Sequence, residues 1–229
     1  NELYIKKKVD FQKEFTEHID NDDDIDRAIS LLEKLIDDQK IPYNSGKIRD
    51  IIHFIQQFSE NHQRGKAFFI KMEKILTHIK DQIKLAFSNT RLFNLFINNK
   101  SMLLIFFKLE LIVIDEDIFN ILMNSNIYFK SYFYPEIRSF VCKVQQSKEP
   151  YLTKLNDLKK EMLAIDPDFF ENFDEKRQNG ENHHNICYLI RNDSKDDFII
   201  HCNENKISLL SSVTPSIFET NCFLINQKK

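Results

Sequence analysis

The chain has 229 residues, of which 42% are hydrophobic and 29% are charged, and its formal net charge is −3 at pH 7. Such a chain can bury a core as one long domain or two small ones, and its slight acidity argues against nucleic acid as a partner, because nucleic-acid binders usually carry a basic excess. The sequence has only 3 glycines and none lies in a glycine-rich motif, which argues strongly against phosphate-cradling loops and dinucleotide-binding folds.

Cysteine usage and hydropathy indicate a cytoplasmic protein without a membrane span. The 4 cysteines form no dense framework, which is typical of reduced thiols inside the cell. Residues 1–8 are charged and lack the apolar core of a signal peptide. The most apolar run, residues 102–114, contains Lys108 and Glu110 and is shorter than the ~20 residues that a membrane span needs, so we expect buried helices there.

The N-terminal part of the chain predicts a series of amphipathic helices, because apolar residues recur at the spacing of one helix face. These apolar stripes are Tyr4, Phe11, Phe15 and Ile19; Ile25, Ala28, Leu32, Leu35 and Ile36; Ile48, Ile51, Ile52, Ile55 and Phe58; and Phe68, Met72, Ile75, Leu76, Ile79 and Ile83. The segments between them, residues 22–24, 42–46 and 61–65, have the composition of turns.

From residue 88 onward the predicted helices become shorter and more apolar. We expect helices over residues 89–98, 101–109, 116–124, 128–141 and 149–163. Asp166-Pro167 has the pattern of an N-cap followed by proline at the first helical position, which predicts another helix from there. No alternating strand pattern stands out, and residues 206–212, the nearest candidate, are interpreted as an irregular connection.

The C-terminal region predicts a pair of short helices. Two apolar stretches, residues 186–190 and 198–200, flank a tight turn in which Ser194 is placed to cap the second helix. Two helices of this size cannot bury their apolar faces alone. We therefore expect packing against a preceding helix and among Leu189, Ile190 and Phe198.

The whole pattern predicts an all-α fold of stacked helix hairpins, as in a solenoid. The polar break at residues 178–182 predicts a domain boundary, with an N-terminal helical domain over residues 1–180 and a separate unit over residues 181–229. Within this last unit, Thr214-Pro215 predicts a short helical turn that carries Ile217 and Phe218.

Acidic residues early in the chain have the ligand spacing of an EF-hand-like calcium loop. Loop positions 1, 3, 5, 9 and 12 are filled by Asp22, Asp24, Asp26, Ser30 and Glu33. Position 6, however, is Arg27, where the turn requires glycine, and the apolar stripe that begins at Ile25 predicts a helix across the same residues. We therefore expect an acidic first helical turn and no physiological calcium site.

Metal-capable side chains gather near the C-terminal helix pair. They are His183, His184, Cys187, His201 and Cys202, of which His183 and Cys187 have the spacing of one helix face. The sequence has no Cys-x-x-Cys motif, and adjacent residues rarely both point at one ion. We therefore expect no stoichiometric zinc, and no metal or cofactor site.

The sequence carries no catalytic signature, so we expect a protein that is not an enzyme. A nucleophile, a base and an orienting group would have to meet within hydrogen-bond reach, and no motif that arranges them is present. The aromatic residues 128–134 include Lys130 and could stack on nucleic-acid bases, but without a wider basic patch we interpret them as core packing. The run Lys6-Lys7-Lys8 is interpreted as a solvated helix face.

Several segments together resemble one known family. The run Ile186-Cys187-Tyr188-Leu189-Ile190-Arg191-Asn192-Asp193-Ser194, followed by Asp197-Phe198-Ile199, looks like the start of a divergent ankyrin-like unit. With Ser216–Asn221, Phe133–Ile137 and the helix at Ile25–Lys40, it resembles the helical N-terminal region, a domain of unknown function, of a large protist family of ankyrin-repeat proteins. The resemblance covers nearly the whole chain and brings no catalytic residues. It implies non-enzymatic protein recognition by a helical domain that caps an ankyrin-like solenoid.

The function predicted from these observations is a protein-interaction or scaffold module with a protein partner. The alternative that stays open is a regulatory domain that binds a ligand or metal through the acidic segment or the His/Cys cluster. Members of the resembled family continue into ankyrin repeats, so we expect a fragment of a longer protein. Its C-terminal end is then expected to promote self-association through the partly exposed side chains of Phe218, Phe223 and Leu224.

Overall fold

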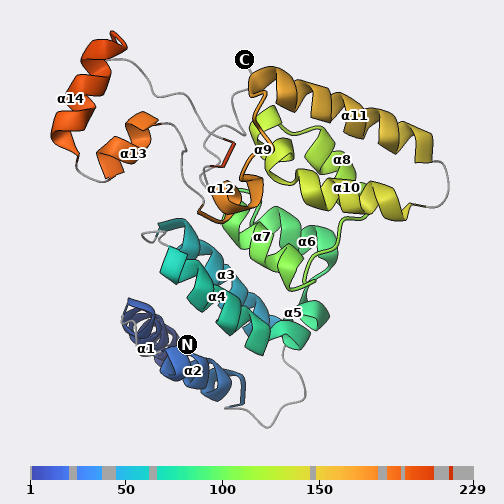
Figure 1. The fold of residues 1–229 in the computed structure, drawn as a ribbon. Coiled ribbons are helices and arrows are strands. Elements are labelled where there is room, and N and C mark those ends of the chain that lie inside the picture. Colours follow the sequence, from blue (N-terminus) through green and yellow to red (C-terminus); the bar gives the residue numbers. More distant parts are fainter. Residues whose placement is uncertain are drawn as a thin grey trace. The chain divides into compact units, whose positions relative to one another are not determined.

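Helices form all the regular structure in the part of the chain that the computed structural model describes, which is residues 2–20, 25–37, 45–61, 66–144, 148–179, 185–191, 194–208 and 217–218. No strand occurs within these ranges, so the all-α prediction is confirmed (Figure 1). By its internal contacts the chain divides into two compact units, Asn1–Val113 and Ile114–Lys229. The predicted boundary between residues 180 and 181 falls within the second unit, outside the described ranges.

The first unit is built from helices that follow the predicted apolar stripes. Its helices are α1 (Glu2–Asp20), α2 (Ile25–Asp37), α3 (Ser45–Asn61), α4 (Lys66–His78), α5 (Lys80–Ala86), α6 (Asn89–Leu95) and α7 (Lys100–Lys108). Helix α1 packs on α2, α3 packs on α5, and α4 contacts both α2 and α7. Most stripe residues whose side chains are described form its core, because their burial removes apolar surface from water, and Phe15, Leu32, Ile52 and Leu76 are almost completely enclosed. Ile25 and Phe58 are half-buried.

One predicted helix of the first unit is interrupted. The stripe from Phe68 to Ile83 predicts a single helix, but the backbone leaves the helical conformation at Ile79, where φ is −104° and ψ is 17°. The Ile79 side chain is fully buried, and its amide still donates to the carbonyl of Ile75 at 3.3 Å. The apolar face therefore continues across the break, which is why side-chain spacing did not reveal it.

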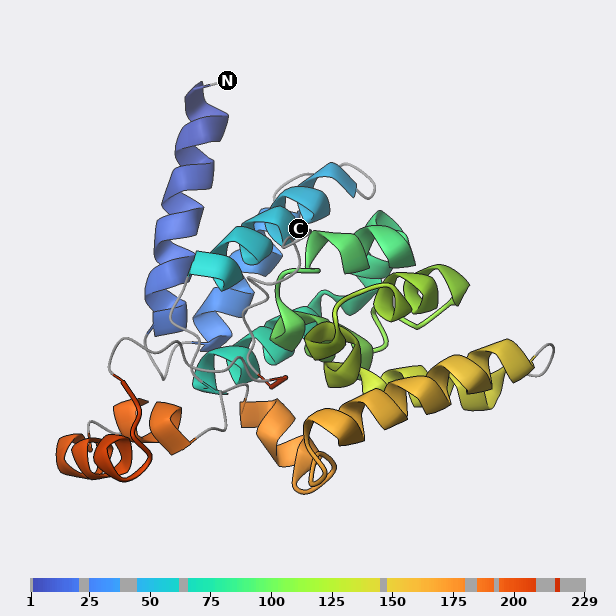
Figure 2. The same ribbon diagram turned by 90° about the horizontal axis from the view of Figure 1, so that it is seen from above.

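The second unit contains the remaining helices. They are α8 (Glu116–Met123), α9 (Ile127–Tyr132), α10 (Tyr134–Lys143), α11 (Lys148–Ile165), α12 (Phe173–Asn179), α13 (Asn185–Arg191) and α14 (Lys195–Glu204). Helix α9 contacts α8 and α11, and α13 packs on α14. The long helix α11 runs alongside α10, as both views show (Figure 1 and Figure 2).

The helix predicted over residues 128–141 is two helices instead. The break lies at Phe133, with φ −98° and ψ 18°. Pro135 follows near the start of α10, and proline has no N–H to donate to the carbonyl four residues earlier. Continuous helix is therefore unfavourable at this point, and the backbone turns at the fully buried Phe133.

The helix predicted to open at Asp166-Pro167 does not begin there. The Asp166 carboxylate accepts from the amide of Asp168 at 3.0 Å, and the carbonyl of Asp166 accepts from the amide of Phe169 at 3.1 Å. These bonds form consecutive turns, Asn172 adopts a positive φ of 52°, and α12 starts only at Phe173. The capping chemistry is present, but it stabilises a turn.

The C-terminal end differs from its prediction in one described residue. The Phe218 side chain is fully buried, so its expected exposure is wrong. It packs on the aromatic rings of Phe169 and Phe173. Thr214, Pro215, Phe223 and Leu224 lie outside the described residues.

Candidate functional site

The helix pair α13–α14 is the candidate site, because it combines a packed inner side with an apolar outer surface. The chain turns between the helices with the amide of Ser194 donating to the carbonyl of Leu189 at 3.0 Å. Ser194 is the N-cap residue of α14, as predicted, although its side chain makes no capping hydrogen bond. Leu189 and Cys202 are buried and Phe198 is half-buried, so these residues supply the inner side.

The outer surface of the pair exposes large apolar side chains. Ile190 is 57% exposed, Ile199 is 47% exposed and Ile200 is 53% exposed. The prediction that Ile190 packs with Leu189 and Phe198 is therefore wrong. Adjacent helical residues point about 100° apart, so Leu189 can be buried while Ile190 is exposed.

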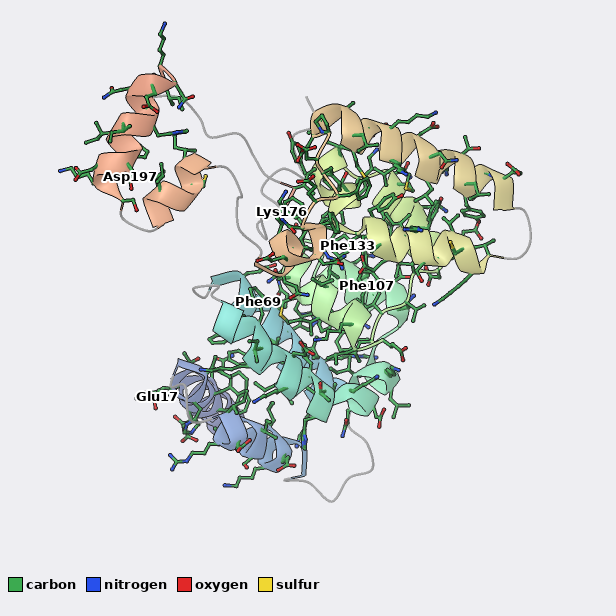
Figure 3. All side chains as sticks on the ribbon, viewed as in Figure 1. Glu17, Phe69, Phe107, Phe133, Lys176 and Asp197 are labelled. Carbon is green, nitrogen blue, oxygen red and sulfur yellow. The ribbon has the colours of Figure 1, made fainter. Side chains whose placement is uncertain are left out.

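Acidic side chains flank the exposed isoleucines on α14. Asp196, Ile200 and Glu204 are spaced four residues apart and share one helix face, and all of them are exposed. Asp197, labelled in Figure 3, is exposed one position further round the helix. Lys195 is exposed as well, four residues before Ile199, so the border of this outer face of α14 is mixed in sign but acidic overall. Such a face is complementary to a surface that is apolar and mainly basic.

The residues considered for calcium do not form a loop where the structure describes them. Helix α2 begins at Ile25, so Asp26, Ser30 and Glu33 lie within a helix, and the predicted helical interpretation of this segment is confirmed. The Glu33 carboxylate instead meets the ring of His78 at 2.7 Å. Asp22 and Asp24 lie outside the described residues.

The residues considered for zinc are only partly described. Cys187 is half-buried, Cys202 is buried, and the Nδ1 atom of His201 lies 3.1 Å from the side-chain Nδ2 atom of Asn205. His183 and His184 fall in an undescribed range. In the part of the chain that is described, no three His, Cys, Asp or Glu side chains are grouped to hold a metal ion.

Most of the aromatic residues in segment 128–134 are core, as interpreted from the sequence, and Tyr128 is half-buried. Phe129, Tyr132, Phe133 and Tyr134 are buried, and Phe133 contacts both Phe129 and Tyr132 ring to edge. Base stacking would need exposed ring faces, so these rings do not form a nucleic-acid platform. The side chains of Lys6, Lys7 and Lys8 lie outside the described set.

Burial also changes the acidity of one aromatic residue in this core. Burial raises the pKa of the Tyr134 phenol above 10.0, the nearby Cys142 raises it further, and the charge of Arg138 opposes the change. The phenol is therefore neutral at physiological pH. It offers a hydroxyl group, and it has no tendency to act as a base there.

Sequence reasoning missed the buried cation of the second unit. The guanidinium of Arg177 on α12 lies 2.9 Å and 2.7 Å from the two carboxylate oxygens of Glu136, and 3.3 Å from the carbonyl of Tyr132. It also lies over the rings of Tyr132 and Phe173, at 5.8 Å and 5.4 Å. The Tyr132 hydroxyl donates in return to the Arg177 carbonyl at 3.2 Å. Arg177 stands in a polar run with no distinguishing motif, so no sequence signal pointed to it.

No protein-family model, curated protein or solved structure matches the chain. The resemblance to ankyrin-repeat proteins therefore stays a prediction. Within the described residues, none of the helices combines the length and apolar character required to cross a membrane.

Proposed function

We propose that the protein is a protein-interaction or scaffold module that binds its partner through the outer face of α13–α14. The observation behind this proposal is the exposure of Ile190, Ile199 and Ile200 on one helix pair. A single exposed isoleucine is ordinary on a protein surface. Several on one small element, with an acidic border, are typical of a surface that another protein covers.

The packing of neighbouring helices supports a scaffold of stacked hairpins. Among the described helices, consecutive ones pack on each other at α1–α2, α8–α9, α10–α11 and α13–α14. Such hairpins present an extended surface when they stack, and this arrangement is common in proteins that bind other proteins. The solenoid-like stacking is part of the proposal.

The test compares what the chain captures with and without the apolar face. We expect Ile200→Lys to lose the partner that wild-type protein enriches in an affinity capture read by quantitative mass spectrometry. The matched control is Ile70→Lys on α4, because Ile70 is 50% exposed and belongs to the first unit. Both are surface substitutions and should change stability by only about 0.5 kcal/mol.

The outcomes separate cleanly. A partner that is retained by the Ile70→Lys variant and lost by the Ile200→Lys variant supports the proposal. Identical captured proteins for wild type and both variants would refute a role for α13–α14. Circular dichroism of each variant confirms that the helical fold is intact.

A further inference from the structure

The Phe218 side chain fills an aromatic site on the second unit. Its ring lies nearly parallel to that of Phe169, with the centroids 5.8 Å apart, and meets the ring of Phe173 edge-on at 5.5 Å. The ammonium group of Lys176, labelled in Figure 3, lies 5.8 Å from the centroid of the Phe218 ring. Neighbouring Ile217 is buried as well. A stacked ring, an edge-on ring and a cation together favour an aromatic occupant over an aliphatic one.

The walls of this site are held by contacts that do not involve Phe218. On α12, Arg177 binds the Glu136 carboxylate and the Tyr132 carbonyl. These bonds fix the helix that carries Phe173 and Lys176.

The turn that carries Phe169 has its own support. The ring of Phe169 contacts Phe170 at 5.2 Å, and Phe170 contacts Tyr134 of α10 at 5.4 Å. The site should therefore keep its shape when Phe218 is withdrawn. A preformed binding site behaves in this way, whereas an ordinary core loses its shape when one of its side chains is removed.

The occupant reaches the site from a distant part of the sequence. Phe218 follows α14, whereas the walls belong to α12 and the turn before it. Because occupant and site are joined by the chain, their association is intramolecular, at an effective concentration set by the intervening chain. A weak aromatic contact is enough to keep the site filled under these conditions.

We propose that Phe169, Phe173 and Lys176 form a binding site for a short peptide with an apolar-aromatic pair, and that the chain's own Ile217-Phe218 occupies it as an internal ligand. This site is distinct from the outer face of α13–α14. An external segment of the same chemistry, such as that of a second copy, gains access only when the internal ligand is displaced.

The test removes the internal ligand from the site and supplies the same ligand as a separate peptide. The probe is a fluorescein-labelled peptide of residues 213–221, and binding to the full chain is read by fluorescence anisotropy. We expect the Phe218→Ala protein to bind this peptide at least about tenfold more tightly than wild-type protein, whose internal ligand competes for the same site. The double variant Phe218→Ala with Phe169→Leu should lose the gain, because it lacks the stacking ring.

Two controls make the result decisive. A peptide in which Phe218 is replaced by alanine should not bind the vacated site. Circular dichroism and thermal unfolding report whether the Phe218→Ala protein is folded. Equal binding of the two peptides, or no binding by folded Phe218→Ala protein, would overturn the proposal. So would global unfolding of that variant, because the site would then not exist without its occupant.

Discussion

Replacing Arg177 by methionine should destabilise the second unit by roughly 3–5 kcal/mol. The Arg177 side chain is only 10% exposed, and its Glu136 partner is 18% exposed. Methionine fills a similar volume, but it removes the cation that pairs with the poorly exposed Glu136 carboxylate. It also removes the hydrogen bond to the Tyr132 carbonyl. Most of the expected loss is the cost of that uncompensated charge and does not measure the net strength of the pair.

A double-mutant cycle isolates the coupling between the two side chains. Glu136→Gln removes the negative charge, and the double variant with Arg177→Met removes both charges. We expect the double variant to be more stable than the sum of the single losses implies, by about 1–3 kcal/mol. Lys160→Met is the matched control, because Lys160 pairs with Asp157 at 3.5 Å on the exposed surface of the same unit. Such a pair contributes at most about 1 kcal/mol.

The assay is urea unfolding followed by far-UV circular dichroism, since the chain has no tryptophan to report by fluorescence. Hydrogen exchange read by mass spectrometry then shows whether the faster-exchanging amides belong to α9, α10 and α12. A loss below about 1 kcal/mol for Arg177→Met would refute this reasoning, as would strict additivity in the cycle. An equal effect of the Lys160→Met control would do the same.

Further predictions concern the first unit, metals and alkaline pH. Asn99→Ala should cost about 2–3 kcal/mol in urea unfolding, because Asn99 is fully buried, caps α7 through the amide of Met102 and donates to Ser59. Calorimetry should detect no micromolar calcium binding that Glu33→Ala removes, and elemental analysis should find no zinc that Cys187→Ser removes. Burial, then the hydrogen bond to Glu116, raises the pKa of the Tyr151 phenol above 10.0, so the stability it contributes is present below pH 10.0 and is lost above it. The urea concentration at the midpoint of unfolding, measured from about pH 9 to about pH 11, should therefore fall less steeply with pH for Tyr151→Phe than for wild-type protein.

Most helices could be predicted from the sequence because each depends on local spacing. The stripe of Ile48, Ile51, Ile52 and Ile55 places four side chains on one side of α3, and all of them are buried. Periodicity of this kind reports which face a helix buries. It does not report small departures of the backbone, so the breaks at Ile79 and Phe133 were missed.

The contacts of the Arg177–Glu136 pair and of the Phe218 site could not be predicted in the same way. Arg177 and Glu136 belong to different helices, and their pairing depends on how α12 packs against α10. Phe218 and Phe169 are likewise brought together only by the fold. The sequence around each of these residues does not indicate whether its side chain is buried against a partner or exposed to solvent.

The candidate site on α14 shows the limit of periodicity at closer range. Phe198, Ile199 and Ile200 are consecutive and all apolar, so at most one or two of them can face α13. The structure half-buries Phe198 and exposes the two isoleucines. A short, uniformly apolar run correctly predicts that a helix packs against a neighbouring helix. It does not show which of its side chains face that neighbour and which face solvent.

The predicted self-association now has a different physical basis. Phe218 is buried and does not contribute a sticky surface, whereas Ile199 and Ile200 on α14 remain exposed. A symmetric dimer through this face would place the same patch of both copies together, so antiparallel α14 helices would bring Asp196 of one copy near Glu204 of the other. Like charges at such distances repel, and salt screens the repulsion over about 10 Å at 0.1 M and about 3 Å at 1 M.

Self-association through α14 should therefore be weak at low salt and should strengthen as salt is added. Light scattering at both ionic strengths measures it directly, with Ile200→Lys as the variant that removes it. The double substitution Asp196→Asn and Glu204→Gln removes the like charges of the border. The doubly substituted protein should therefore self-associate at low salt as strongly as wild-type protein does at high salt. Association that weakens with added salt would show that attraction between charges holds the copies together. Such a result would contradict the repulsion expected between the acidic borders of the two copies.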